Sequence, residues 1–461
     1  MKEKVDLIVK GGLIVTLGSG GCFEGGVAVR GSRIVGVDKT PALEDKYYAD
    51  EVIDARGHIV MPGLIDVHVH TAQQFLRGKI SELTKRPGFK LRYPIWKNYL
   101  IPFESCLREE DVYLSGLATY CNMIKMGTTC FAEHGGPHPD AMGKAAAEVG
   151  IRGTIARSTL DINHDDLPKN MRDTTKSAIS ESERLIRNWH NRAEGRIRVS
   201  LSLRQIIVCS LELYKTFAQL AEKYDLIIQT HIAEGAYEIY YCLQNFGKRT
   251  AEVLNEIGFL SKRVLAAHSA QLSENELRIF SEKNVKVAHC PSGNFASFGA
   301  PKIPHMMRNN IVVGLGSDGG AWNNLDLFRE MKISKTCQLS HFGALYLDNA
   351  VVRDEDLVRM ATVEGAKAMG LEGEIGRLEV GMKADMIIVK VNELWSAPCN
   401  DPYFNLVNCV SGNDVRTVII DGKVVMKDRR LKTVDEEHLM DEIGKRVPQI
   451  MDRFEGLITQ R

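Results

Sequence analysis

The sequence has 461 residues, in which lysine plus arginine and aspartate plus glutamate balance at 59 each. A chain of this length can bury a large core and form one large domain with a small one. Because the charges balance, no strong field favours nucleic acid or an anionic membrane, and a small, weakly charged partner fits better. Ten cysteines without a Cys-x-x-Cys pair indicate reduced thiols, not a disulfide framework or a zinc knuckle.

The amino-terminal residues 1–6 carry charges where a signal peptide needs an apolar core. No uninterrupted apolar run in the sequence approaches the length that spans a membrane. We therefore expect a cytoplasmic protein without a membrane partner.

Both ends of the chain show a pattern of short strands. Between residues 6 and 60 the pattern predicts strands over 6–15, 26–29, 33–37 and 49–54, with Gly-rich turns and no helix between them. After residue 375 it returns over 384–389, 415–420 and 423–426, with an Asp421-Gly422 turn before the last strand. We expect residues 1–60 and 376–461 to form one small β-sandwich domain, with a terminal helix after its last strand.

Residues 61–375 alternate between apolar, strand-like segments and helix-like segments. The predicted strands are 59–67, 127–132, 151–157, 197–203, 226–230, 264–267, 285–288 and 311–315. Ser273 with Glu276 forms a capping box at the start of one intervening helix, and Gly150 ends another. Eight strands with helices between them are the count for a (β/α)₈ barrel, an α/β fold of the TIM type.

In such a barrel the catalytic groups follow the carboxyl ends of the strands. In this sequence the polar residues found there are His68, His70, Glu133, His134, Arg204, His231, Glu234, His268, His289 and Asp318. Each alone has a structural explanation, and for His134 and His289 we favour a structural or hydrogen-bonding role over metal binding. The roles of Glu133 and of Cys290, which follows His289, stay open. The joint placement of these residues predicts a functional site at one end of the barrel.

His68 and His70 lie two residues apart in an extended segment, so both imidazoles point to the same side. Together with His231 and Asp318 they supply three imidazoles and a carboxylate, a suitable set for one divalent metal ion that keeps a position open for water. Glu234 lies beyond His231, where it could move protons without binding the metal. We expect His268 to orient or polarise the nucleophile.

Taken together, these motifs resemble the amidohydrolase superfamily, specifically its mononuclear aminohydrolase branch. The matching segments cover nearly the whole chain: Pro62-Gly63-Leu64-Ile65-Asp66 before His68-Val69-His70, Gly127-Thr128-Thr129, His231-Ile232-Ala233-Glu234, Ala267-His268, His289-Cys290-Pro291-Ser292-Gly293-Asn294, Gly316-Ser317-Asp318-Gly319 and residues 376–385. The resemblance implies the barrel, the flanking β-sandwich, a bound zinc or iron ion and the ligand set given above. It also implies an aminohydrolase that acts on C–N bonds in cyclic amidines.

The residues that would select the substrate resemble two groups within this branch. Gln73 and Arg204 resemble the residues with which guanine deaminases hold guanine, although Gln205 stands where those enzymes have phenylalanine. Glu104 resembles the glutamate with which nucleoside deaminases grip ribose hydroxyls. A guanidinium buried without an acceptor would be costly, so we expect a substrate carbonyl or ring nitrogen to meet Arg204.

We therefore expect a metal-dependent deaminase that releases ammonia from an amino-substituted heteroaromatic ring, most readily a purine base, a pterin or a purine nucleoside, in the manner of guanine deaminases. Glu234 would protonate the ring and the departing amine, while Asp318 and His268 receive and steer the proton of the attacking water. Deamination of a nucleoside such as S-adenosylhomocysteine or methylthioadenosine, and hydrolysis of a triazine, are the alternative enzyme activities. A scaffold protein that has lost its metal is disfavoured, because every ligand is present. The expected partner is a small heterocyclic substrate, and we expect a homo-oligomer.

Overall fold

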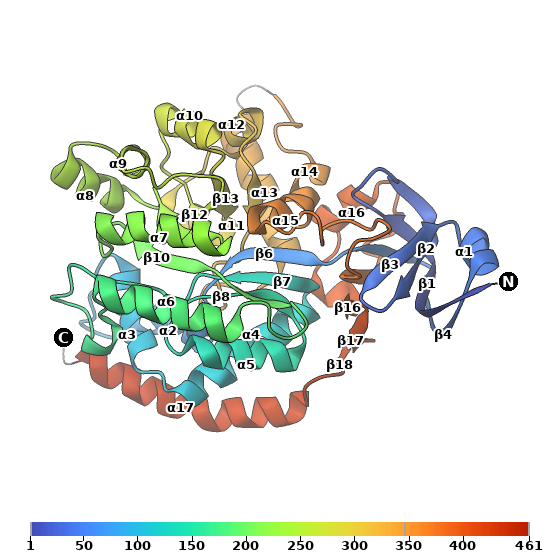
Figure 1. Ribbon diagram of the computed structural model, residues 1–461, viewed down its shortest axis with the longest axis horizontal. Helices are drawn as coiled ribbons and strands as arrows, with labels where there is room; N and C mark the ends of the chain where they lie inside the picture. The colour runs from blue at the N-terminus through green and yellow to red at the C-terminus, as the bar shows by residue number, and fades with distance from the viewer. Residues whose placement is uncertain (1, 345–346, 460–461) are drawn as a thin grey trace.

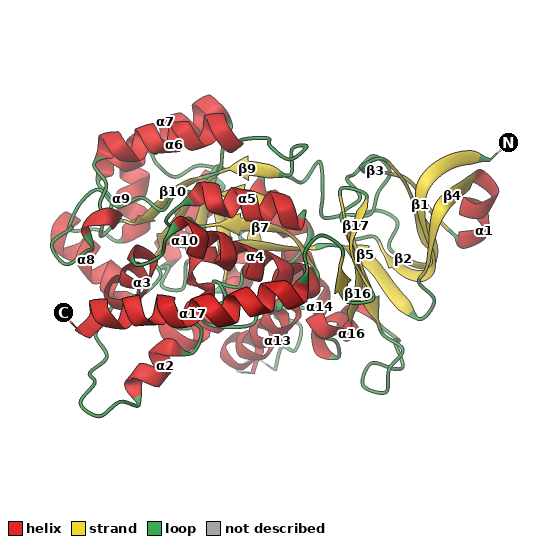
Figure 2. Ribbon diagram, turned by 90° about the horizontal axis from the view of Figure 1, so that it is seen from below, coloured by secondary structure: helices red, strands yellow, loops and turns green. Residues whose placement is uncertain are grey.

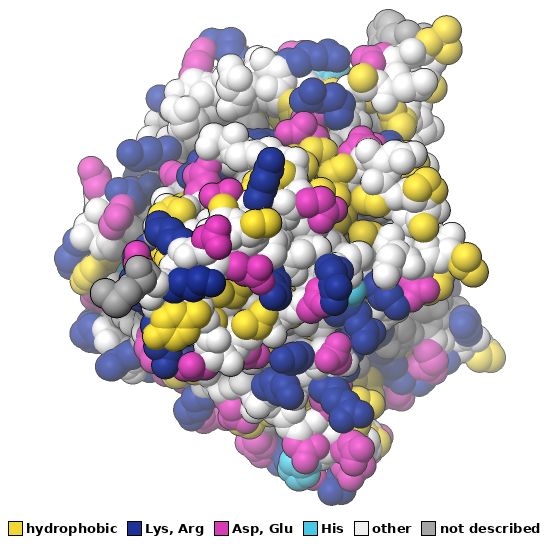
Figure 3. Space-filling model, turned by 90° about the vertical axis from the view of Figure 1, so that its right-hand side faces the viewer, with side chains coloured by type: hydrophobic (Ala, Val, Ile, Leu, Met, Phe, Trp, Pro, Cys, Tyr) yellow, Lys and Arg dark blue, Asp and Glu magenta, His cyan; other side chains and the backbone are white. Residues whose placement is uncertain are grey.

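The computed structural model describes residues 2–344 and 347–459. Its larger part is a barrel of parallel strands surrounded by helices, and a separate sheet lies beside the barrel (Figure 1, Figure 2). Within these residues no helix is both long and apolar enough to cross a membrane. Positive and negative side chains are interspersed over the face that carries the small sheet (Figure 3), as the balanced composition predicts.

Strands from both ends of the chain form one hydrogen-bonded, nine-stranded sheet. They are β1 (Glu3–Val15), β2 (Cys22–Arg30), β3 (Arg33–Asp38), β4 (Tyr47–Asp54), β5 (His58–Pro62), β15 (Met386–Lys390), β16 (Val415–Ile420), β17 (Lys423–Lys427) and β18 (Arg430–Leu431). The two chain ends join where β5 pairs antiparallel with β15, with Val60 opposite Ile388. These two residues share a core with Val9 and Val27, so the two ends bury apolar surface against each other. The more specific β-sandwich domain, with its boundaries at residues 60 and 376, stays a prediction.

Two predictions for the amino-terminal segment are wrong. A short helix, α1 (Thr40–Lys46), lies between β3 and β4, with Pro41 in its first turn. The single strand predicted over 59–67 is two strands, because β5 ends at Pro62 in the small sheet and β6 (Leu64–Val69) begins the barrel. Gly63 divides them at a close approach, since a Cβ there would lie 2.1 Å from Thr129 Oγ1.

The barrel strands follow one another around the barrel in chain order. They are β6, β7 (Thr128–Glu133), β8 (Arg152–Ile155), β9 (Ile197–Val199) continued by β10 (Leu201–Gln205), β11 (Ile228–Ile232), β12 (Val264–His268), β13 (Lys286–His289) and β14 (Val313–Leu315). Neighbouring strands pair in parallel, and the interruption between β9 and β10 divides the hydrogen bonding into two sheets. A parallel bridge between Thr159 and Leu203 joins the sheets on one side. On the other side the Asp318 N–H donates to the His68 carbonyl oxygen at 2.9 Å, which closes the predicted (β/α)₈ barrel.

Helices cover the outside of the barrel. The main ones are α4 (Glu109–Lys125), α5 (Pro139–Val149), α6 (Thr175–Trp189), α7 (Leu211–Tyr224), α8 (Ala236–Phe246), α9 (Thr250–Glu256), α10 (Glu274–Lys283), α13 (Leu327–Gln338), α14 (Asp354–Met360) and α15 (Val363–Met369). The capping box of Ser273 and Glu276 starts α10, and Gly150 ends α5, as predicted. After the small sheet, α17 (Glu436–Thr459) runs along the barrel, where Arg446 and Arg453 pair with buried Asp111 of α4 (Figure 2).

Candidate active site

The four predicted metal ligands converge at the carboxyl ends of the barrel strands. His68 and His70 lie at the end of β6, His231 lies in β11, and Asp318 follows β14. The centroid of the His68 ring lies 4.9 Å from that of His70 and 5.1 Å from that of His231. Asp318 Oδ1 lies 3.5 Å from His68 Nε2 and 3.7 Å from His70 Nε2. Side chains from three distant segments therefore meet at one point.

The hydrogen bonding of these side chains fits a metal ion. His68 Nε2 is buried and has no hydrogen-bond partner among the described residues. His231 donates from Nδ1 to the Arg204 carbonyl oxygen at 2.6 Å, which leaves its Nε2 for a metal. Burial lowers the pKa of His70 and of His231 well below the ordinary value of 6.5, so both rings are neutral and keep a lone pair. Three neutral imidazoles and a carboxylate are a donor set that suits zinc or iron.

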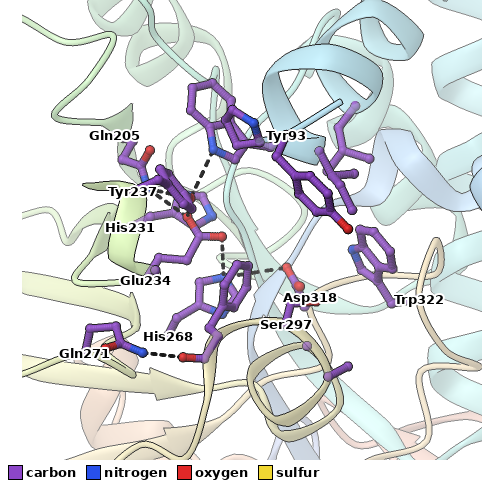
Figure 4. A pocket seen from close by; sticks show the side chains of 18 of the residues that line it. Tyr93, Gln205, His231, Glu234, Tyr237, His268, Gln271, Ser297, Asp318 and Trp322 are labelled. Carbon is purple, nitrogen blue, oxygen red and sulfur yellow. Dashed lines mark hydrogen bonds and ion pairs between the residues drawn. The ribbon is translucent and has the colours of Figure 1, made fainter. Parts of the chain in front are cut away.

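The two residues predicted to handle protons lie beside these ligands (Figure 4). His268 Nε2 is 3.8 Å from Glu234 Oε1 and 3.9 Å from Asp318 Oδ1. The backbones of His268 and Asp318 are left-handed, with φ of 66° and 63°. This conformation costs a non-glycine residue about 1 to 3 kcal/mol and is found most often at functional sites. Here it coincides with two side chains that line the same cavity.

A chain of hydrogen bonds behind His268 fixes its orientation. His268 Nδ1 donates to Asn294 Oδ1 at 2.8 Å, and Asn294 Nδ2 donates to His289 Nδ1 at 3.1 Å. His289 Nε2 then donates to Ser334 Oγ at 3.0 Å. Because its Nδ1 proton is committed to Asn294, a neutral His268 presents the lone pair of Nε2 to the site. His289 is thus a hydrogen-bonding group, as expected, whereas the sequence revealed no role for Asn294 beyond its place in a motif.

The structure also indicates roles for Glu133 and Cys290, which the sequence left open. Glu133 accepts hydrogen bonds from the backbone N–H groups of Thr71 and Gly135, both at 2.9 Å, and so holds the turn that follows His70. Burial raises the pKa of the Cys290 thiol well above 9.0, so Cys290 is a protonated packing group. His134 differs: its ring lies 4.1 Å from that of His231, and neither ring nitrogen has a hydrogen-bond partner among the described residues.

The three predicted substrate-binding residues form one buried cluster. Gln73 Nε2 donates to Glu104 Oε1 at 2.6 Å, and Arg204 Nη1 lies 3.3 Å from the same oxygen. Glu104 therefore provides an acceptor for the Arg204 guanidinium within the protein, and the expected contact of Arg204 with a substrate carbonyl or ring nitrogen stays a prediction. The second carboxyl oxygen, Glu104 Oε2, is buried and accepts no hydrogen bond from the described residues.

Arg204 and the predicted metal ligands His70, His231 and Asp318 line a cavity of about 660 Å³, whereas Gln73 and Glu104 lie behind this lining. Pockets that bury drug-sized ligands span roughly 300 to 1,000 Å³. The buried end of the cavity contains His70, Arg204, His231, Glu234, His268 and Asp318. Aromatic side chains line the remainder, namely Tyr93, Trp96, Tyr237, Phe298 and Trp322, and rings of this kind suit a flat heteroaromatic substrate. Tyr93 and Trp322 are the most exposed of them and flank the mouth (Figure 4).

A (β/α)₈ barrel with histidines and an aspartate at the carboxyl ends of its strands, and a glutamate beside them, defines a metal-dependent hydrolase. Comparison with known proteins then gives the family. The family model described as "Amidohydrolase family" matches residues 59–425. The chain therefore belongs to the amidohydrolase family, as its motifs predict.

Relatives with deaminase names cover almost the whole chain. A 5-methylthioadenosine/S-adenosylhomocysteine deaminase from Acetivibrio thermocellus is 35% identical over 89% of this chain and 91% of its own length. A 5'-deoxyadenosine deaminase from Methanosarcina mazei is 33% identical over 97% of this chain and 99% of its own length. With these relatives, the chain is a hydrolase that acts on C–N bonds, as predicted.

Solved structures with lower identity share the fold. An adenosine deaminase from Xanthomonas campestris with bound zinc superposes with a TM-score of 0.88 at 24% identity, over 99% of this chain and 100% of that chain. An atrazine chlorohydrolase from Arthrobacter aurescens complexed with zinc superposes with a TM-score of 0.82 at 22% identity, over 96% and 100% of the two chains. At these identities the likeness concerns the fold alone.

Proposed function

We propose that the protein is a metal-dependent deaminase of adenine nucleosides that are altered at the 5′ position. The sequence alone favoured an oxo-amino purine or pterin, with adenine-type nucleosides as the close rival. Two observations support the change. The relatives named above are deaminases of 5-methylthioadenosine, S-adenosylhomocysteine and 5′-deoxyadenosine. In addition, Arg204 already has an acceptor in Glu104, so the guanidinium does not require a substrate with a carbonyl group.

The observation that carries the nucleoside proposal is the free oxygen of Glu104. Its Oε1 is occupied by Gln73 and Arg204, while Oε2 is a buried acceptor without a donor from the described residues. A buried acceptor of this kind costs free energy until it is hydrogen-bonded. A ribose hydroxyl supplies the missing donor, and a free base has no hydroxyl to offer. Arg204, which contacts Glu104 Oε1, lines the cavity that receives the substrate.

In this proposal His68, His70, His231 and Asp318 hold one zinc or iron ion. When bound, such an ion lowers the pKa of water to roughly 7 and thereby supplies a nucleophile at neutral pH. Asp318 Oδ1 and His268 Nε2, 3.9 Å apart, receive and steer the proton of the attacking water. Glu234 Oε1 faces His268 Nε2 and donates its proton to a ring nitrogen. The carboxylate is then reprotonated by the proton taken from the attacking water and passes this second proton to the departing amine, which leaves as ammonia. Burial raises the pKa of Glu234 above 4.5, so the carboxyl keeps its proton closer to neutral pH.

The test is an ammonia-release screen on the metal-loaded enzyme, with metal content and oligomeric state measured on the same preparation. The substrates are 5′-methylthioadenosine, S-adenosylhomocysteine, 5′-deoxyadenosine, adenine, guanine, a pterin and a triazine. We expect kcat/KM for at least one nucleoside to exceed that for every free base and for the pterin. Turnover of guanine or the pterin without turnover of any nucleoside would overturn the proposal. The homo-oligomer stays a prediction, which light scattering on the same preparation tests.

A further inference from the structure

A group of donors surrounds the far side of the Glu234 carboxyl. Tyr237, one turn along the chain in α8, donates from its hydroxyl to Glu234 Oε2 at 2.5 Å. Gln205, at the end of β10, donates from Nε2 to the same oxygen at 2.7 Å. Trp96 from η2 (Trp96–Leu100) lies behind them and donates from Nε1 to the Tyr237 hydroxyl at 3.0 Å. Trp96, Gln205, Glu234 and Tyr237 all line the cavity (Figure 4).

The directions of these hydrogen bonds follow from the chemistry of the groups. An indole N–H can only donate, so the Tyr237 hydroxyl accepts from Trp96 and must send its own proton to Glu234. The Gln205 amide lies between two carboxylates, because its Nε2 is also 3.2 Å from Glu238 Oε2, the same distance as from the Tyr237 hydroxyl oxygen. Two acceptors require the NH₂ end of the amide at this position. Both donors to Glu234 Oε2 are therefore fixed by their surroundings.

This arrangement distinguishes the two oxygens of Glu234. Oε2 accepts two hydrogen bonds, which occupy both of its lone pairs. When Glu234 is protonated, its proton therefore lies on Oε1, the oxygen that is 3.8 Å from His268 Nε2. The anchored oxygen also prevents the carboxyl group from rotating and exchanging the two oxygens.

We propose that Tyr237 and Gln205 are positioning residues that fix the Glu234 carboxyl, so that its acidic proton always faces the reaction centre. The inference rests on the proposed role of Glu234 in deamination and deepens it. Trp96 extends the arrangement, because η2 continues directly into α3 (Ile101–Ser105), the helix that carries Glu104. The segment that holds the substrate-binding carboxylate is thereby connected to the residue that orients the proton donor. Gln205 stands where guanine deaminases carry phenylalanine, so this chain has a hydrogen-bond donor in place of an apolar ring.

The test is a double-mutant cycle between Tyr237→Phe and Glu234→Gln, measured with the best substrate of the screen described above. Tyr237→Phe removes one hydroxyl, and we expect kcat to fall by about 10- to 100-fold, the rate equivalent of one hydrogen bond to a charged group, with KM nearly unchanged. In the Glu234→Gln background the same change should have little further effect, because Tyr237 acts through Glu234. Tyr241→Phe is the matched control, since Tyr241 lies one turn further along α8 and its hydroxyl contacts Asn163 outside the cavity.

Gln205→Met is the second variant, and it removes the other donor while keeping a side chain of similar length. It should also lower kcat and also fail to add to Glu234→Gln. Metal content and thermal unfolding of each variant show that the fold and the metal site are intact. Losses that add fully to that of Glu234→Gln, an unchanged kcat in Tyr237→Phe, or an equal loss in Tyr241→Phe would overturn the proposal. The double-mutant cycle uses whichever substrate the enzyme turns over. If the nucleoside proposal fails, the substrate screen shows this, and the cycle still tests the roles of Tyr237 and Gln205 independently.

Discussion

Replacing Glu104 tests the nucleoside proposal at the residue that carries it. Glu104→Gln keeps the size of the side chain and a carbonyl oxygen that can accept from Gln73 or Arg204, but it removes the negative charge. A hydrogen bond to a charged group contributes about 1.5 to 3 kcal/mol, which corresponds to roughly 10- to 150-fold in kcat/KM. We therefore expect kcat/KM for 5′-methylthioadenosine to fall by roughly this factor in Glu104→Gln. Turnover of adenine, which has no ribose to contact Glu104, should change little.

The same residue has a structural role whose size follows from its contact with Arg204. At 3.3 Å and an effective dielectric constant of about 20, two opposite charges attract by roughly 5 kcal/mol before desolvation is subtracted. Removing one partner of such a buried pair leaves an uncompensated charge and typically costs about 3 to 5 kcal/mol. Glu104→Ala should therefore lower the free energy of unfolding by about this amount, and Glu104→Gln by less.

Kinetics on a nucleoside and a base, with unfolding by denaturant on the same variants, separate the two roles. If the loss of activity is structural, Glu104→Gln should depress turnover of the nucleoside and the base equally, and that result would refute the ribose contact. The contact is also refuted if Glu104→Gln leaves nucleoside turnover unchanged while Arg204→Ala abolishes turnover of guanine. In that case the Arg204 guanidinium binds a base that carries a carbonyl and an amino group, as the sequence first indicated.

Three further predictions concern the metal, the proton donor and stability. The wild type should carry close to one zinc or iron ion per chain, and His68→Ala and Asp318→Ala should each lose it; unchanged metal content and turnover in both would show that the ligands are misassigned. Glu234→Gln should retain the metal while turnover falls by roughly 10² to 10⁴; loss of the metal would instead make Glu234 a ligand. Burial raises the pKa of Glu330 to about 7 from 4.5, so its contribution to stability is complete below the lower value and is lost as pH rises through the higher one. Glu330→Gln should therefore flatten the decline in unfolding free energy between about pH 4.5 and pH 7 by roughly 3 kcal/mol, and an unchanged decline would contradict this assignment.

The barrel and its candidate metal site could be predicted because both depend on local patterns. Alternation in an extended segment places His68 and His70 on one side, and the rule that strand ends meet at one face adds His231 and Asp318 from distant segments. Residue type then restricts the chemistry, because three imidazoles with a carboxylate have few purposes other than metal binding. The structure brings these residues together, and it also places His268 within reach of His68 and His231, so the ligand set itself stays a prediction.

Features that depend on contacts between distant segments could not be predicted in the same way. The run over 59–67 is apolar on both sides of Pro62-Gly63, so hydrophobicity alone does not show that its two halves belong to different sheets; the structure shows it, with Gly63 packed closely against Thr129 where the barrel begins. The hydrogen bonds that orient His268 and Glu234 depend on Asn294, Gln205 and Tyr237. Their side chains have no distinctive pattern in the sequence, because the geometry that aims them is three-dimensional.

The substrate illustrates why residue identities alone were insufficient at the cavity. Arg204 resembles a residue that reads guanine and Glu104 resembles one that grips ribose, and each considered alone indicates a different substrate. In the structure Arg204 Nη1 lies 3.3 Å from Glu104 Oε1. Each side chain therefore gives the other a hydrogen-bond partner, a role that had been expected of a substrate group. Only the hydrogen-bonding atoms that have no partner within the protein can select a substrate. On Glu104 this atom is Oε2, an acceptor without a donor among the described residues. An acceptor selects a donor, and the donors that separate a nucleoside from its base are the ribose hydroxyls.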